Sequence, residues 1–263
     1  MKEDQTNNDT NNDDGERKYR APALEKGLDI LELLSRHGAP MTTSQMAATL
    51  GRSVSELFRM VLALEYRGYI AASLDGRDGY TLTNKLFTLG IAQGSARVLL
   101  EAALPVMKEL SREVGQSCHL VVPSGDQIVV VARIESPMDL GFSVRVGYRK
   151  RLVDTSSGLM LYGYAPTEAK ANWYPLLEAS CDAELMKEFL ERSEAAVADG
   201  HVQSPSDFVD GVTDICVPVL GMQGAVASLT VPYIKIRSQT ITAEQVLAGL
   251  LLAATKIAEA LGD

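Results

Sequence analysis

Between residues 41 and 69, two apolar patterns of helical period flank a single glycine. Thr42 and Gln45 have the spacing of a capping box, and the positions after them predict a short helix that ends at Gly51. Apolar residues then recur at steps of three and four, which predicts a helix over residues 53–66 with four side chains facing inward: Val54, Leu57, Val61 and Leu64. This layout predicts a helix-turn-helix, whose second helix offers a polar face to the DNA major groove. The alternative is an ordinary pair of packed helices.

The elements on either side of this pair favour DNA binding. Residues 24–35 predict a preceding helix, and residues 69–73 and 79–83 predict two strands around an Asp-Gly turn. Three helices followed by a hairpin make a winged helix-turn-helix, with Arg77 at the tip of the wing. The first helix is expected to face the core with four leucines: Leu24, Leu28, Leu31 and either Leu33 or Leu34.

The pattern changes after the wing. Residues 84–114 predict helices, with a break near Gly90 or Gly94 and with Pro105 in the first turn of a further helix, where its missing N–H costs little. Beyond residue 116, antiparallel hairpins mixed with helices predict an α+β domain. Its expected strands are 118–123, 127–135, 140–146, 213–220 and 225–232, and its expected helices are 155–165, 167–179, 182–199 and 242–261.

Charge refines the DNA prediction. The net charge of −9 excludes a strongly basic, non-specific binder. Residues 21–85 nevertheless carry seven Lys/Arg and seven Asp/Glu, while residues 86–263 carry 14 and 21. A DNA-binding region without net charge fits a sequence-specific binder that makes few phosphate contacts per subunit and gains affinity by forming a dimer. Residues 1–20 hold few apolar side chains and predict a disordered tail.

Other functional classes are disfavoured. No apolar run is long enough for a membrane span and the first residues are too polar for a signal peptide, so we expect a cytosolic protein without a membrane partner. The three widely spaced cysteines predict no zinc site, and we expect no metal, cofactor or catalytic residue. Cys118 and His119 point to opposite faces of a predicted strand, and residues 154–158 are not a nucleophile elbow, which argues against an enzyme. A winged helix that binds protein remains an alternative.

Four segments, in this order, resemble the IclR family of bacterial transcriptional regulators. Residues 55–69 carry an arginine at position 59 and a Leu-Glu-x-x-Gly-Tyr ending. Residues 147–158 are similar to the family's Gly-x-Arg…Thr-Ala-x-Gly segment, residues 207–219 to its Gly-Val…Pro-Val segment, and residues 228–232 to its Ser-x-Ser-Gly-Pro. The resemblance covers residues 21–262.

The resemblance implies an α+β chain with an N-terminal winged helix and a C-terminal effector-binding domain of GAF-like fold, in which helices flank an antiparallel sheet. The expected domains are a disordered tail (1–20), a DNA-binding domain (21–83), linker helices (84–115) and an effector-binding domain (116–263). The expected function is sequence-specific regulation, as a repressor, of a double-stranded DNA operator. A small organic acid is the expected effector, a homodimer or dimer of dimers the expected assembly, and the linker helices the expected route of coupling.

Candidate site residues fall into two sets. For DNA, Ser55, Glu56 and Arg59 are expected to face base edges, and Arg52 and Arg77 to approach phosphate. An internal salt bridge between Arg59 and Glu56 is the alternative. For the effector, Thr155 is expected to cap a helix whose first N–H groups, at Ser156 and Ser157, suit a carboxylate. By resemblance, four further residues line the same pocket: Asp207, Cys216, Ser228 and Thr230.

Each effector assignment has a plainer alternative. Thr155 is then only a helix cap, Cys216 a packed thiol, and Ser228 and Thr230 ordinary strand residues. The chain also departs from the family pattern near the pocket, with Arg151, Val153 and Leu159 in place of the usual Pro, His and Lys. These departures predict a pocket that differs from those of other members.

Overall fold

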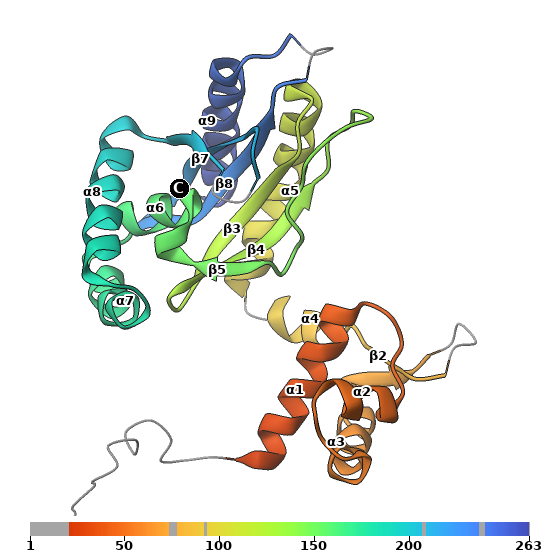
Figure 1. The fold of residues 1–263 in the computed structure, drawn as a ribbon. Coiled ribbons are helices and arrows are strands. Elements are labelled where there is room, and N and C mark those ends of the chain that lie inside the picture. Colours follow the sequence, from red (N-terminus) through yellow and green to blue (C-terminus); the bar gives the residue numbers. More distant parts are fainter. Residues whose placement is uncertain (1–20, 74–77, 92–93, 207–208, 237–239, 263) are drawn as a thin grey trace, which may run out of the picture. The chain divides into compact units, whose positions relative to one another are not determined.

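The computed structural model describes residues 21–73, 78–91, 94–206, 209–236 and 240–262 (Figure 1). The chain divides into two compact units, Met1–Gln93 and Gly94–Asp263. Among the residues described, no helix is both long enough and apolar enough to cross a membrane.

The first unit is a winged helix-turn-helix, as predicted. Helices α1 (Pro22–His37), α2 (Thr43–Thr49) and α3 (Val54–Tyr66) precede the antiparallel hairpin of β1 (Ile70–Ala72) and β2 (Tyr80–Leu82), and α4 (Lys85–Ile91) follows. Capping boxes start both helices of the helix-turn-helix, at Thr42 and Ser53. The core comprises Ile30, Leu34, Met41, Met46, Ala47, Leu57, Val61 and Ile70.

Three of the inward-facing side chains predicted for this unit are exposed instead. Leu24 and Leu28 are 62% and 49% exposed, because the buried face of α1 is set by Ile30 and Leu34. Val54 is 44% exposed since it is the first residue of α3, before the turn that packs through Leu57. Helical spacing identified an amphipathic helix in each case, but the apolar stripe is wider than the face that packs.

The second unit is an α+β domain, as predicted. Its described residues form a six-stranded antiparallel sheet in the order β5-β4-β3-β8-β7-β6, with a helical layer on each face (Figure 1). α5 (Gly94–Val114) and α9 (Ala243–Ala260) cover one face. α6 (Ser156–Gly163), α7 (Thr167–Ser180) and α8 (Ala183–Asp199) lie on the other. The strands are β3 (Cys118–Ser124), β4 (Gln127–Ile134), β5 (Arg149–Arg151), β6 (Val202–Pro205), β7 (Val212–Gly221) and β8 (Gly224–Ile234).

Two local predictions in this unit are wrong, and one strand was missed. Residues 140–146 form no strand; the edge strand β5 begins only after Gly147, whose φ of 84° turns the chain. β6 was not predicted. Pro105 lies inside the continuous helix α5 rather than at the start of a new one, because Ala103 and Met107 on either side are fully buried in the same core.

Candidate DNA-reading surface and effector site

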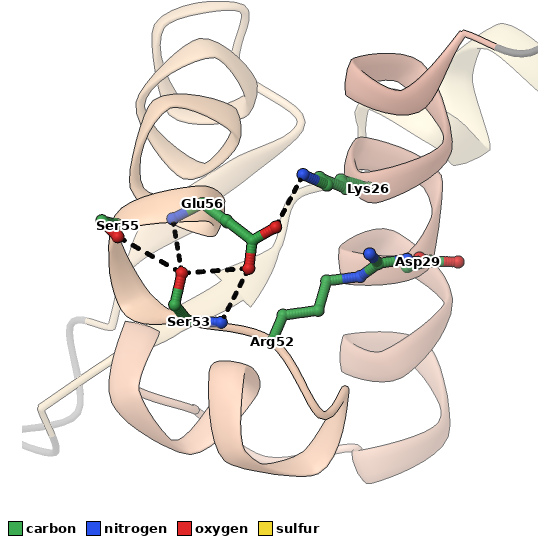
Figure 2. A network of polar contacts seen from close by, with 6 residues as sticks. All are labelled: Lys26, Asp29, Arg52, Ser53, Ser55 and Glu56. Carbon is green, nitrogen blue, oxygen red and sulfur yellow. Dashed lines mark hydrogen bonds and ion pairs between the residues drawn. The ribbon is translucent and has the colours of Figure 1, made fainter.

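The start of α3 is held to α1 by the carboxylate of Glu56 (Figure 2). Glu56 Oε2 accepts hydrogen bonds from the backbone N and the Oγ of Ser53, both at 3.0 Å, and Oε1 accepts one from Lys26 Nζ at 3.0 Å. The Ser53 backbone N–H and then the Lys26 ammonium lower the pKa of Glu56 to about 2. Both oxygens therefore have internal partners, which hold the carboxylate toward α1.

Arg52 makes a second link to α1. Its Nη2 lies 3.1 Å from Asp29 Oδ2, and its Nε is buried without a hydrogen-bond partner (Figure 2). The guanidinium thus points from the turn between α2 and α3 back into its own unit. Lys26–Glu56 and Asp29–Arg52 together fix how the start of α3 sits against α1.

Arg59 differs from both. It is exposed on α3 and makes no ion pair or hydrogen bond with any other residue that the structure describes. The alternative pairing with Glu56 does not form, because Glu56 is bound to Lys26. Ser55 is also exposed, with its Oγ 3.2 Å from Ser53 Oγ. Arg77 lies outside the described residues.

Three elements of the second unit bring the predicted effector residues together. Thr155 is the N-cap of α6, and its Oγ1 accepts from Gly158 N at 3.0 Å. Ser157 Oγ lies 3.0 Å from Thr230 Oγ1 on β8, which in turn lies 3.2 Å from Cys216 Sγ on β7. Ser156 Oγ contacts Ser204 Oγ on β6 at 3.0 Å. The start of α6 therefore lies against the sheet, beside hydroxyls of β6 and β8 and the Cys216 thiol of β7. Asp207 is outside the described residues.

Two buried polar groups extend this cluster along the sheet. Ser228 lies two residues before Thr230, on the same face of β8, and its buried Oγ has no hydrogen-bond partner. His119 on β3 is directly opposite Thr230 in the ladder. His119 was not among the predicted site residues, although it points to the opposite face of the strand from Cys118 and therefore faces α6.

Burial controls the chemistry of the titratable groups here. It lowers the pKa of His119 to about 4, so the imidazole is neutral at neutral pH and offers one donor and one acceptor. Burial also raises the pKa of Cys216 to about 12, which keeps the thiol protonated. The described part of the chain has no group of three or more His, Cys, Asp or Glu residues placed to hold a metal. The cluster is suited to hydrogen bonding rather than nucleophilic or metal chemistry.

The three residues that depart from the family pattern are held by an ion pair or by core packing. Arg151 forms a two-pronged ion pair with Asp154, with Nε–Oδ2 and Nη2–Oδ1 both at 2.8 Å, across the 3-10 turn Leu152–Asp154 that leads into α6. Val153 and Leu159 are buried in the core between the sheet and α8. The approach to the start of α6 is thus built from an ion pair and apolar packing.

The neutral state of His119 gives a pH prediction. The pKa of His119 is about 4 in the folded protein and 6.5 in the unfolded chain. The unfolded state therefore binds more protons below pH 6.5, and the folded state loses stability as the pH is lowered. The loss should reach on the order of 3 kcal/mol near pH 4. In urea unfolding between pH 7.5 and 4, His119→Gln should lose less stability than the wild type. Equal losses in the two proteins would contradict this role for His119.

Comparison with known proteins places both units in one family. Residues 23–73 match the IclR helix-turn-helix domain, and residues 94–259 match the C-terminal domain of bacterial transcriptional regulator IclR. The protein belongs to the IclR family. It is therefore a transcriptional regulator with a helix-turn-helix DNA-binding domain, in a family whose members bind DNA and small-molecule effectors.

Relatives agree with this assignment. The IclR-family chain is 24% identical over 207 residues to the transcriptional regulator KipR of Bacillus subtilis (strain 168), covering 77% of this chain and 82% of KipR. It is 27% identical over 218 residues to KdgR of Escherichia coli (strain K12), covering 80% and 81%. An IclR homolog from Microbacterium hydrocarbonoxydans, solved with 4-hydroxybenzoate, has the same fold with a TM-score of 0.75 at 21% identity, covering 91% of this chain and 99% of that one.

Proposed function

We propose that this IclR-family regulator is a repressor that binds a specific operator as a homodimer or dimer of dimers and is controlled by a small organic acid. Support for repression comes from one relative, the transcriptional repressor AllR of Escherichia coli (strain K12). On the DNA side, Ser55 and Arg59 are the exposed base-reading groups, with Arg77 on the wing near phosphate. Glu56 and Arg52 position α3 instead, because both are bound to α1.

The observation that carries the effector proposal is the buried polar cluster at the start of α6. Ser228 Oγ is fully buried and unpartnered, a state that costs free energy unless a ligand or water satisfies the group. The first N–H groups of α6, at Ser156 and Ser157, have no partner within the helix and favour an anion. A carboxylate and a hydroxyl of the effector would bind to five residues: Ser156, Ser157, Ser228, Thr230 and neutral His119. Asp207 and Cys216 are proposed to line the same pocket.

The acid found with one structural relative suggests the first probe. A carboxylate at the α6 N-terminus and a hydroxyl at Ser228 is a pattern that 4-hydroxybenzoate would satisfy, and that relative was solved with this compound. We expect acid binding to favour one arrangement of the DNA-binding units over another, through the linker helices, because a ligand shifts an equilibrium only by its preference between states.

A thermal-shift screen of aromatic, aliphatic and sugar acids, led by 4-hydroxybenzoate, tests this proposal. A hit should bind Ser228→Ala and Thr155→Val roughly tenfold more weakly in calorimetry. Ser228→Ala removes a hydroxyl proposed to bind the acid, and Thr155→Val removes the cap that holds the start of α6. Met222→Ala, which truncates an 89% exposed side chain elsewhere in the unit, is the control. Unchanged affinity in both pocket variants would rule out this site.

A further inference from the structure

The outward face of α3 combines polar and apolar side chains in one patch. Ser55, Phe58, Arg59 and Leu62 are related by steps of three and four residues, so they are neighbours on the helix surface. Phe58 is 52% exposed and Leu62 is 45% exposed. Leu57 and Val61, which alternate with them, are almost fully buried, so the patch faces away from the core.

The core of the unit does not account for Phe58 and Leu62. A single exposed apolar residue is common on protein surfaces, but these two adjoin each other and an arginine without a described partner. They also lie on the second helix of a helix-turn-helix, the element that enters the major groove. Glu56, three residues before Arg59 on α3, pairs with Lys26 and not with Arg59.

The major groove matches this mixed chemistry. Guanine presents the O6 and N7 acceptors that suit a guanidinium, and the apolar group that the groove exposes is the 5-methyl of thymine. We infer that Phe58, supported by Leu62, contacts a thymine methyl next to the base read by Arg59 and so determines specificity for thymine at that position. This inference rests on the proposed DNA-binding function and adds a base to what the regulator reads.

Replacing thymine by deoxyuridine isolates the methyl group, because uracil keeps every hydrogen-bonding group of thymine. The full-length protein would first select its preferred duplex from a random DNA pool. Each thymine of that duplex would then be exchanged for deoxyuridine, and affinity measured by fluorescence anisotropy. We expect one position per half-site at which the exchange weakens wild-type binding, by roughly fourfold for one methyl group and about tenfold or more when both half-sites are changed.

Protein variants assign that effect to a side chain. Phe58→Ala should bind the thymine and deoxyuridine duplexes equally, and Phe58→Leu, which keeps an apolar group, should retain part of the difference. Both are expected to fold because Phe58 lies outside the core. Met222→Ala, which removes another exposed apolar side chain from the second unit, should discriminate like the wild type.

The outcomes distinguish a failure of the Phe58 contact from a failure of DNA binding. If a duplex is selected but no thymine exchange changes affinity by more than twofold, or if Phe58→Ala keeps the wild-type discrimination, the Phe58 inference is overturned while DNA binding stands. If no duplex is enriched at all, the proposed operator binding fails, and the inference fails with it; a protein partner would then be sought for the patch.

Discussion

Arg59→Ala is expected to lower affinity for the selected duplex by at least about thirtyfold. A bidentate contact between arginine and guanine is worth roughly 1–3 kcal/mol, and a dimer makes it twice, for a total of roughly 2–6 kcal/mol. Arg59 is suited to this contact because its guanidinium is exposed and has no partner among the described residues. Arg52, only seven positions earlier, is already paired with Asp29.

Two matched variants make the Arg59 experiment specific. Arg59→Lys keeps the charge but lacks the planar fork, so it should retain affinity for random DNA and lose most of its preference for the selected duplex. Arg192→Ala removes an exposed arginine that is paired with Glu188 on α8, and it should leave DNA binding unchanged. Anisotropy titrations at one salt concentration would give, for each variant, the ratio of its affinities for the selected and the scrambled duplex. An Arg59→Ala protein that binds the selected duplex within threefold of wild type would show that Arg59 is not a reading residue.

The fold could be predicted from the sequence where local chemistry determines it. Thr42 with Gln45 starts a helix at the expected residue, and Gly200 ends α8 in the left-handed conformation. The errors lie where tertiary packing overrides local preference. Pro105 would end an isolated helix, yet α5 continues through it because both flanking turns pack into the core. Strand β6 is four residues long and shows no alternation of apolar and polar residues in the sequence. It is recognised as a strand only through its pairing with β7.

The two sites differ in how much of them the sequence discloses. The role of Glu56 was recognisable, since Ser53 and Glu56 have the same capping-box spacing as Thr42 and Gln45. Its ion pair with Lys26, 30 residues earlier, depends on how α1 packs and has no local signal. His119 likewise joins the effector cluster only through strand register, because pairing with Thr230 brings together residues over a hundred positions apart.

Substitution of Gly158, in the first turn of α6, is the second change for which we expect a large effect. A Cβ on Gly158 would lie 2.0 Å from the carbonyl oxygen of Leu152 and 2.7 Å from its carbonyl carbon. Both are backbone atoms of the turn that precedes α6, so no side-chain rotation relieves the overlap. We expect Gly158→Ala to destabilise the second unit by about 3 kcal/mol or more, measured by urea unfolding.

The same substitution should also abolish effector binding, because relief of the overlap moves the start of α6 away from the turn. Gly158 N is the donor that Thr155 caps, and Ser157 next to it contacts Thr230, so both contacts depend on the close approach at Gly158. Gly27→Ala is the matched control: Gly27 also lies inside a helix, but a Cβ there would have no atom within 4 Å. Gly27→Ala should raise the free energy of unfolding by about 0.5–1 kcal/mol, because alanine has the higher helix propensity. If Gly158→Ala instead stayed within about 1 kcal/mol of wild type and kept its acid affinity, α6 would be free to shift, and the tight junction with the turn would not be what positions the site.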